Sequence, residues 1–158
     1  MSNEHIIRAI ELAKQSVNQG GGPFAAVIVK DNQIIGEGVN QVTQQNDPTA
    51  HAEIQAIRNA CKKLSSFQLT DCTLYTTSEP CPMCLSAIYW SRLEQVYYAN
   101  SYQQAKLAGF DDQFIFNQLN LPHQQKKIHI SQIQETEILN KAADIFRLWD
   151  NKEDKIKY

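Results

Sequence analysis

Apolar residues near the start of the chain recur with a helical spacing. They stand four, three and four residues apart with polar residues between them, and the positions are Ile6, Ile10, Ala13 and Val17. This spacing puts them on one face and predicts an amphipathic helix over residues 3–19. The glycine run 20–22 ends the helix; it lacks the Gly-Lys-Ser/Thr ending of a phosphate-binding loop, so we interpret it as a turn.

Two apolar runs then predict a β-hairpin. Residues 24–30 are almost continuously apolar, and a second run covers residues 33–40 after the turn-forming pair Asp31-Asn32. The continuous first run is typical of a strand that is buried on both faces. The polar segment 40–47 is expected to be a loop.

A helical stripe follows this loop. Its apolar members are Ile54, Ile57, Ala60, Cys61 and Leu64. Pro48 is expected in the first turn of this helix, with Asp47 or Thr49 as the cap.

The middle of the chain predicts a strand, a helix and a second strand. Residues 72–77 and 94–99 have the composition of strands, and residues 83–90 predict a largely apolar, buried helix between them. This order suggests a parallel crossover.

The last third of the chain has a weaker pattern. It predicts short helices over residues 102–108 and 111–117, a short strand over 126–130 and a final amphipathic helix over 137–149. The whole pattern predicts an α/β fold, with helices on both faces of a sheet, in a single domain of residues 1–158.

Composition narrows the function classes. The 158 residues are 42% hydrophobic and 20% charged, which is typical of a globular domain, and the net charge of −2 argues against a dedicated nucleic-acid-binding protein. No apolar run is long enough for a membrane span, and the first residues do not resemble an export signal. Four cysteines without an export signal favour metal binding over disulfides, so we expect a cytoplasmic protein.

Three side chains predict a metal site: the imidazole of His51 and the thiols of Cys81 and Cys84. These are good Zn²⁺ ligands, and three protein ligands leave the fourth tetrahedral position open, as in catalytic zinc sites. The two cysteines lie three residues apart, so both thiols face one side of a first helical turn, where negative charge is favoured. We therefore expect one Zn²⁺ per subunit.

Glu53, two residues after the histidine, is the only carboxylate that the spacing ties to this site. Zinc lowers the pKa of water in an open coordination position to about 7, and the hydroxide can attack an amidine-like ring carbon. A proton must then reach the ring nitrogen and later the departing amine, and Glu53 is predicted to move it. The pattern H-x-E followed by P-C-x-x-C is the signature of zinc-dependent nucleobase deaminases.

A structural zinc site is the plainer alternative, but it would need a fourth ligand. His5, His123 and His129 do not have ligand spacing with the cysteine pair. Cys61 and Cys72 fall on helix and strand positions that suit the core.

Five segments also carry a resemblance to a known family, and they are 21–24, 46–53, 79–84, 87–90 and 108–112. Over nearly its whole length the sequence resembles the cytidine-deaminase-like superfamily, and within it the bacterial guanine deaminases. The two metal-binding segments are shared by many nucleobase deaminases. Trp90 and the run Gly109-Phe110-Asp111-Asp112 point to the guanine branch.

The resemblance implies a three-layer α/β/α sandwich around a five-stranded mixed sheet. It implies zinc-dependent hydrolysis of guanine to xanthine and ammonia, a step of purine catabolism. His51, Cys81 and Cys84 would bind the zinc, and Glu53 would be the proton shuttle.

The resemblance also assigns substrate contacts. Asn40 and the backbone N–H of Ala52 would hydrogen-bond the purine, Phe24 and Trp90 would stack on it or wall it, and Asp112 would contact the 2-amino edge and assist proton transfer. By pattern alone, Phe24 and Trp90 could also pack in the core, and the aspartate pair could also form a solvated turn.

The C-terminal segment is the last element that the resemblance implies. Residues 151–158 would close the site as a lid, with Tyr158 reaching the ligand. The family often takes this segment from a partner, so we expect a homodimer, in which exchange of the C-terminal segments is one arrangement. We also expect a purine base as the ligand and no nucleic acid or membrane partner.

Three alternatives stay open. A tRNA adenosine deaminase shares both metal motifs but would need a basic face and salt-sensitive binding. A cytosine or cytidine deaminase fits less well, because Phe24, Trp90 and the aspartate pair match the purine branch. A zinc-bearing binding module without catalysis would have no chemical need for Glu53.

Overall fold

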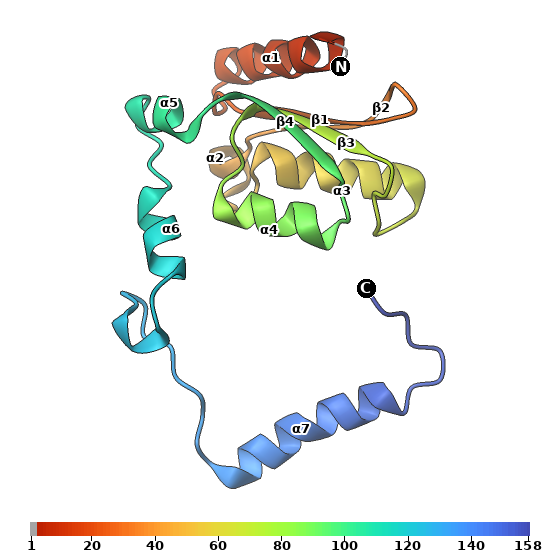
Figure 1. Cartoon of the computed structure of the whole chain (residues 1–158), viewed down its shortest axis with the longest axis vertical. Helices are drawn as coiled ribbons and strands as arrows, with labels where there is room; N and C mark the ends of the chain where they lie inside the picture. Colours follow the sequence, from red (N-terminus) through yellow and green to blue (C-terminus); the bar gives the residue numbers. More distant parts are fainter. Residues whose placement is uncertain (1–2) are drawn as a thin grey trace. The chain divides into compact units, whose positions relative to one another are not determined.

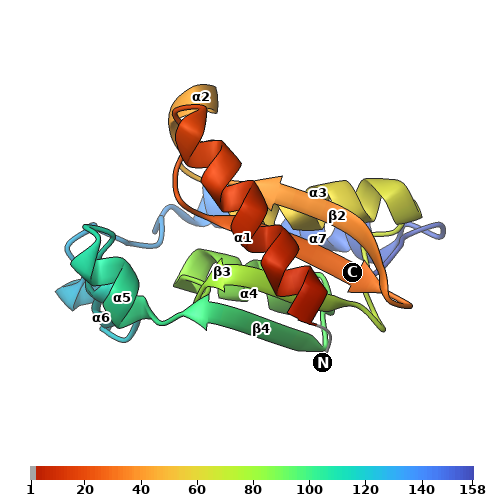
Figure 2. The same ribbon diagram turned by 90° about the horizontal axis from the view of Figure 1, so that it is seen from above.

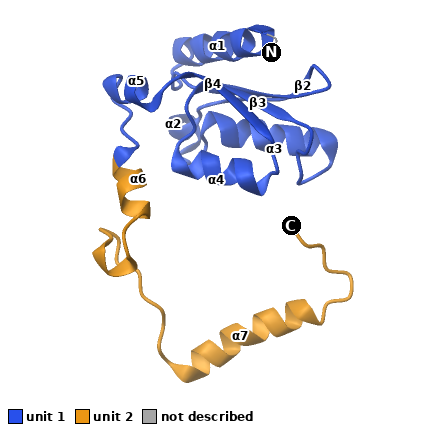
Figure 3. Cartoon of the chain, viewed as in Figure 1, with its two compact units in different colours: residues 1–113 blue, residues 114–158 orange. Residues whose placement is uncertain are grey.

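The computed structural model describes residues 3–158, and the contacts within the chain group them into two units, one ending at Gln113 and the other beginning at Phe114. Figure 3 colours the two units. Each unit is described by itself, and the single domain of residues 1–158 stays a prediction.

The first unit is built on a mixed sheet, which has four strands among the described residues, in the order β2-β1-β3-β4. The strands are β1 (Ala25–Lys30), β2 (Gln33–Val39), β3 (Thr73–Ser78) and β4 (Gln95–Asn100). β1 is antiparallel to both β2 and β3, whereas β3 and β4 are parallel. The predicted hairpin and the predicted parallel crossover are therefore confirmed.

Helices cover both faces of this sheet. α1 (Asn3–Asn18) lies across one face, and α3 (Ala52–Leu64) and α4 (Pro82–Trp90) pack on the other (Figures 1 and 2). β1 is the central buried strand, with Val27 facing α1 and Ile28 facing the other two helices. The predicted α/β fold is confirmed, and so is a first strand buried on both faces.

α1 does not bury the whole apolar stripe that the sequence predicts. Its buried positions are His5, Ala9, Ala13 and Ser16. Ile10 and Val17 are 36% and 51% exposed, so they line the margin of the contact between helix and sheet. Small residues at the buried positions let α1 lie close to the strands.

The expected fifth strand over residues 126–130 is wrong for the described chain, because those residues are irregular and the sheet has four strands. An isolated strand has no ladder of hydrogen bonds to hold it extended. Within the part of the chain that the structure describes, β4 has only β3 as a neighbour, so its outer edge is open.

Two helix predictions also need correction. α3 begins at Ala52 and not near Pro48, because the side chain of Asp47 accepts hydrogen bonds from the N–H and hydroxyl of Thr49 and closes a turn before the helix. The polar loop before this turn holds a short helix, α2 (Val42–Gln45), which no apolar pattern predicts. The helix expected to be buried, α4, has three exposed large apolar residues, and they are Leu85, Tyr89 and Trp90.

The remaining helices follow the weaker predictions, except for the short η1 (His123–Gln125), which no pattern predicts. α5 (Tyr102–Leu107) ends the first unit, α6 (Gln113–Leu119) spans its boundary, and η1 and α7 (Thr136–Asp150) belong to the second unit. α7 has a clear apolar stripe but no buried residue among those described. No helix within residues 3–158 has the length and apolar character that crossing a membrane requires.

Two glycines in β2 set the distance between the sheet and α3. A Cβ atom at Gly38 would lie 2.2 Å from the carbonyl oxygen of Ala52, and one at Gly36 would lie 2.5 Å from that of Ala56. Both oxygens belong to helix backbone, which cannot turn aside as a flexible side chain can. Glycine is therefore required where α3 begins, next to His51.

We expect Gly38→Ala to lower the free energy of unfolding by about 1–3 kcal/mol, the usual cost of overpacking a core. Urea unfolding measures the change. The control is Gln33→Ala, at the exposed start of the same strand, which should stay within about 0.5 kcal/mol of wild type. Equal stability of all three proteins would contradict this account of the helix–sheet contact.

Candidate metal centre and cavity

Two helix N-termini meet at one end of the sheet. His51 is the residue immediately before α3, and Cys81 is the residue immediately before α4. Pro82 occupies the first position of α4, where its missing N–H costs no hydrogen bond. The end of β3 delivers Cys81 to this place, and the first turn of α4 adds Cys84.

The three predicted ligands converge. The Nδ1 atom of His51 lies 3.5 Å from the Sγ atoms of both Cys81 and Cys84, and the three ligand atoms all lie within 4.8 Å of one another. Tetrahedral zinc with Zn–N of about 2.0–2.1 Å and Zn–S of about 2.3 Å separates nitrogen and sulfur ligands by about 3.5 Å. Both thiols are buried, so this donor set fits one Zn²⁺ ion.

The three side chains of the cluster shift one another's pKa values. The pKa of the Cys81 thiol is lowered to about 4, first because Cys84 donates a hydrogen bond to it and then because His51 lies beside it. The same thiol raises the pKa of His51. The pKa of Cys84 is raised by its pairing with Cys81 and by burial. A bound metal ion would take the place of the proton in the hydrogen bond between Cys84 and Cys81.

Glu53 lies in the first turn of α3 and is only 6% exposed. Its Oε2 atom is 3.4 Å from the Sγ atom of Cys84. Burial raises the pKa of the Glu53 carboxyl to about 7, with the nearby Cys81 adding to the effect. A carboxyl with this pKa can both accept and donate a proton near neutral pH.

A cavity of about 270 Å³ opens beside this cluster. Its lining residues are Phe24, Asn40, His51, Ala52, Glu53, Ser78, Glu79, Cys81, Ala105, Phe110, Asp111 and Asp112. Pockets for drug-sized ligands usually measure about 300–1,000 Å³, so this one suits a smaller molecule such as a single base.

Four of the predicted substrate contacts line this cavity: Phe24, Asn40, Ala52 and Asp112. Phe24 meets the ring of Phe110 edge to face, with the centroids 4.7 Å apart. The Oδ1 atom of Asn40 accepts a hydrogen bond from a backbone N–H at 3.3 Å, which leaves its amide Nδ2 as the group that can donate to a ligand. Ala52 opens α3, where N–H groups have no partner within the helix.

The two neighbouring aspartates have different surroundings. Asp111 pairs with Lys106 at 3.1 Å and accepts a hydrogen bond from the N–H of Gln113, and these contacts lower the pKa of its carboxyl. Asp112 is half-buried, and its pKa is raised, first by burial and then by the nearby Cys81. The structure therefore separates a surface ion pair from a carboxyl that faces the cluster.

The other two predicted contacts are not among the residues that line this cavity. Trp90 is 63% exposed and lines a shallow hollow with Ser86, Tyr89 and Arg92. Tyr158 belongs to the second unit, where it lines a hollow whose other residues are Ile145, Phe146, Trp149 and Lys157. Their roles toward a ligand stay predictions.

Sequence reasoning missed several lining residues. Ser78, Glu79, Ala105 and Phe110 were not among the predicted contacts, although Glu79 directly precedes Pro80 and Phe110 directly precedes the aspartate pair. For Ser78 and Glu79 the available signal is their proximity to the metal-binding motif, and for Phe110 it is its proximity to the aspartate pair.

Comparison with known proteins places these features in a family. The cytidine and deoxycytidylate deaminase zinc-binding region matches residues 2–100. The chain is 53% identical to guanine deaminase of Bacillus subtilis over 96% of this chain and 95% of that protein. A crystal structure of guanine deaminase from Bacillus subtilis superposes with a TM-score of 0.93 and 51% identity over 100% of this chain and 99% of that one.

A tRNA-specific adenosine deaminase of Buchnera aphidicola is 40% identical over 88% of this chain and 84% of its own length. The matched family region is a zinc-binding one, and His51, Cys81 and Cys84 lie within it and form a cluster that could hold a metal ion. The chain belongs to the cytidine and deoxycytidylate deaminase family of zinc-binding enzymes.

Proposed function

We propose that this protein hydrolyses guanine to xanthine and ammonia. The observation that carries the proposal is the buried Glu53 carboxyl beside the His51, Cys81 and Cys84 cluster, inside a cavity of about 270 Å³. Similarity to guanine deaminase of Bacillus subtilis over nearly the whole chain supports guanine as the base.

His51, Cys81 and Cys84 would hold the zinc, one ion per subunit. When bound, Zn²⁺ acts as a Lewis acid that brings the pKa of water to about 7 and so supplies a nucleophile at neutral pH. Glu53 takes a proton from the attacking water and gives it to the ring nitrogen beside the amino-bearing carbon. It then helps to protonate the departing amine, which leaves as ammonia.

The cavity lining suits a base rich in N–H donors. Besides Glu53, its lining includes the half-buried Asp112, whereas Asp111 is paired with Lys106 and Glu79 with the N–H of Tyr102. Asp112 would accept hydrogen bonds from the 2-amino edge of guanine and assist proton transfer. Phe24 would stack on the ring, while Asn40 and the N–H of Ala52 would meet its polar atoms.

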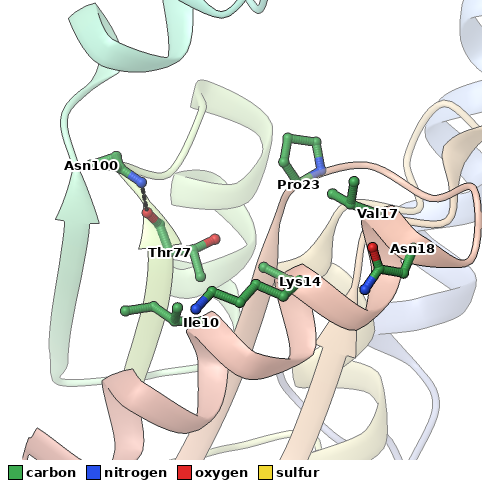
Figure 4. Close-up of a pocket in the computed structure, with 8 residues that line it drawn as sticks. Ile10, Lys14, Val17, Asn18, Pro23, Thr77 and Asn100 are labelled. Atoms are coloured by element: carbon green, nitrogen blue, oxygen red, sulfur yellow. Dashed lines mark hydrogen bonds between the residues drawn. The ribbon is translucent and has the colours of Figure 1, made fainter.

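We also propose a homodimer with exchanged C-terminal segments. On the α1 face of the sheet, a hollow of about 440 Å³ is lined partly by Ile10 and Val17, and Asn100 donates a hydrogen bond to the Thr77 carbonyl at its floor (Figure 4). In the second unit, α7 exposes large apolar side chains, and they are Ile138, Ile145, Phe146, Leu148 and Trp149. Burying such faces against a second copy would stabilise the dimer by about 25 cal/mol for each Å² of apolar surface removed from water.

In such a dimer, residues 151–158 of one subunit would form the lid over the site of the other, with Tyr158 reaching the ligand. Trp90 would wall the base only in this assembly, because within residues 3–158 of one chain it lines a different hollow.

A cytoplasmic location is part of the same proposal. All four cysteines are free in the described chain, and the two in the cluster must stay reduced to bind metal. A reducing compartment maintains both conditions.

We expect Glu53→Gln to keep bound zinc but to lower kcat for guanine by at least about 10²–10⁴-fold, the usual contribution of a proton-transfer group. Ammonia release is measured with guanine, cytosine, cytidine and an adenosine-containing tRNA stem-loop side by side, and zinc by elemental analysis. If the wild-type protein releases ammonia only from the tRNA stem-loop, its substrate is the tRNA adenosine and not guanine. A Glu53→Gln protein with full activity and zinc would contradict the role of Glu53.

Asp112→Asn should lower kcat/KM for guanine by about 10–150-fold, because a hydrogen bond to a charged group is worth about 1.5–3 kcal/mol. The matched control is Asp111→Asn, which removes an exposed ion pair with Lys106 and should change kcat/KM less than about threefold. The reverse ranking of the two variants would assign the substrate contact to Asp111.

Segment exchange can be tested by mixing two inactive variants, Glu53→Gln and Tyr158→Ala, under conditions that let subunits exchange. In a mixed dimer the Tyr158→Ala subunit keeps Glu53 and receives an intact tyrosine from its partner, so that site should regain guanine turnover. Light scattering checks that the protein is a dimer. If each lid covers its own subunit, the mixture will stay as inactive as its components.

A further inference from the structure

Glu79 joins two segments that both line the cavity, the one that leads to Cys81 and the one that leads to Asp112. Its backbone N–H donates to the carbonyl of Asn100 at 2.8 Å, and its Oε2 atom accepts a hydrogen bond from the N–H of Tyr102 at 3.0 Å. The first contact lies where β3 and β4 end, and the second lies at the first residue of α5. One residue thus contacts the end of β4 by its main chain and the start of α5 by its side chain.

Each segment carries part of the site. Glu79 stands two residues before the metal ligand Cys81. The segment that starts at Tyr102 continues through α5 to Phe110 and Asp112, both of which line the cavity. The position of Asp112 relative to the metal cluster therefore depends on how α5 is held at the end of β4.

The contact between Glu79 and Tyr102 is suited to that task. A carboxylate that accepts from a backbone N–H makes a charge-assisted hydrogen bond, which is stronger than one between neutral groups. Both residues are partly buried, so solvent competes less for the contact than on an open surface. Ser101 and Gln104 cap the same helix from within its own sequence, so the link to Glu79 sets where α5 sits more than whether it forms.

We propose that Glu79 is a positioning residue that holds Asp112 in place by anchoring the first turn of α5. The inference rests on the proposed deamination of guanine, in which Asp112 contacts the base. Glu79 acts through Tyr102 and the segment that follows it, and its own carboxylate is engaged in that anchor.

A pair of variants at the donor isolates the hydrogen bond. Tyr102→Pro removes the N–H at the first position of α5, where proline is tolerated, and the preceding residue is already extended as proline requires. Tyr102→Ala removes the same ring but keeps the N–H. A misplacement of about 1 Å can cost about 10²-fold, so we expect kcat for guanine to fall about 10–100-fold in Tyr102→Pro and less than about threefold in Tyr102→Ala.

Variants at the acceptor provide the second arm. Glu79→Ala should match Tyr102→Pro, and Glu79→Gln, which keeps an acceptor oxygen, should recover most of the activity. The double variant Glu79→Ala, Asp112→Asn should have the same kcat as Asp112→Asn alone. If Glu79 acts only by positioning Asp112, its loss has no further effect once Asp112 is changed, so the two effects are not additive. Zinc content should stay at one ion per subunit throughout.

Three results would overturn the inference. They are equal activity of Tyr102→Pro and Tyr102→Ala, losses in Glu79→Gln as large as in Glu79→Ala, and additive losses in the double variant. The second would mean that the charge of Glu79 meets the substrate directly. Hydrogen exchange of the Tyr102 amide is expected to be faster in Glu79→Ala, because the amide loses its acceptor, and this measurement does not depend on turnover. A wild-type protein inactive on guanine would therefore overturn the proposed function separately.

Discussion

The meeting of two helix N-termini at one end of the sheet is the constraint on which the site depends. Thiolate, imidazole and carboxylate groups must come within about 4 Å of one another and out of water, where isolated charges are costly. The first turns of α3 and α4 meet this need, because helix N-termini favour negative charge and their N–H groups are unpartnered. His51, Glu53, Cys81 and Cys84 all come from these two turns.

The contacts that fix the first turns of α3 and α4 also determine the geometry of the candidate metal site. Gly36 and Gly38 let α3 lie against β2 with backbone-to-backbone contact, and the parallel β3–α4–β4 crossover fixes α4 beside it. Burial at the same place raises the pKa of Glu53 to about 7. The packing that places α3 against the sheet therefore also helps to set the pKa of the carboxyl that is proposed to transfer protons.

The metal ligands could be predicted from sequence because their chemistry is local: residue type and short spacing identify His51, Cys81 and Cys84. The start of α3 could not, because the side chain of Asp47 binds Thr49 and delays the helix, a competition that periodicity does not register. Glu79 escaped notice because its partner, Tyr102, lies 23 residues away and offers only a backbone N–H. Contacts to main chain leave no trace in side-chain pattern.

The C-terminal part shows the same limit in a stronger form. Residues 126–130 have the composition of a strand and α7 has an amphipathic stripe, yet in the described chain the former is irregular and the latter has no buried residue. A strand needs the edge of a sheet with which to pair, and the apolar face of a helix needs an apolar surface on which to pack. Neither pattern identifies the partner that the segment would need, so local sequence records the tendency of a segment and not the surface against which it packs. Residues 126–130 have no strand neighbour among the described residues, and composition alone does not hold a segment extended.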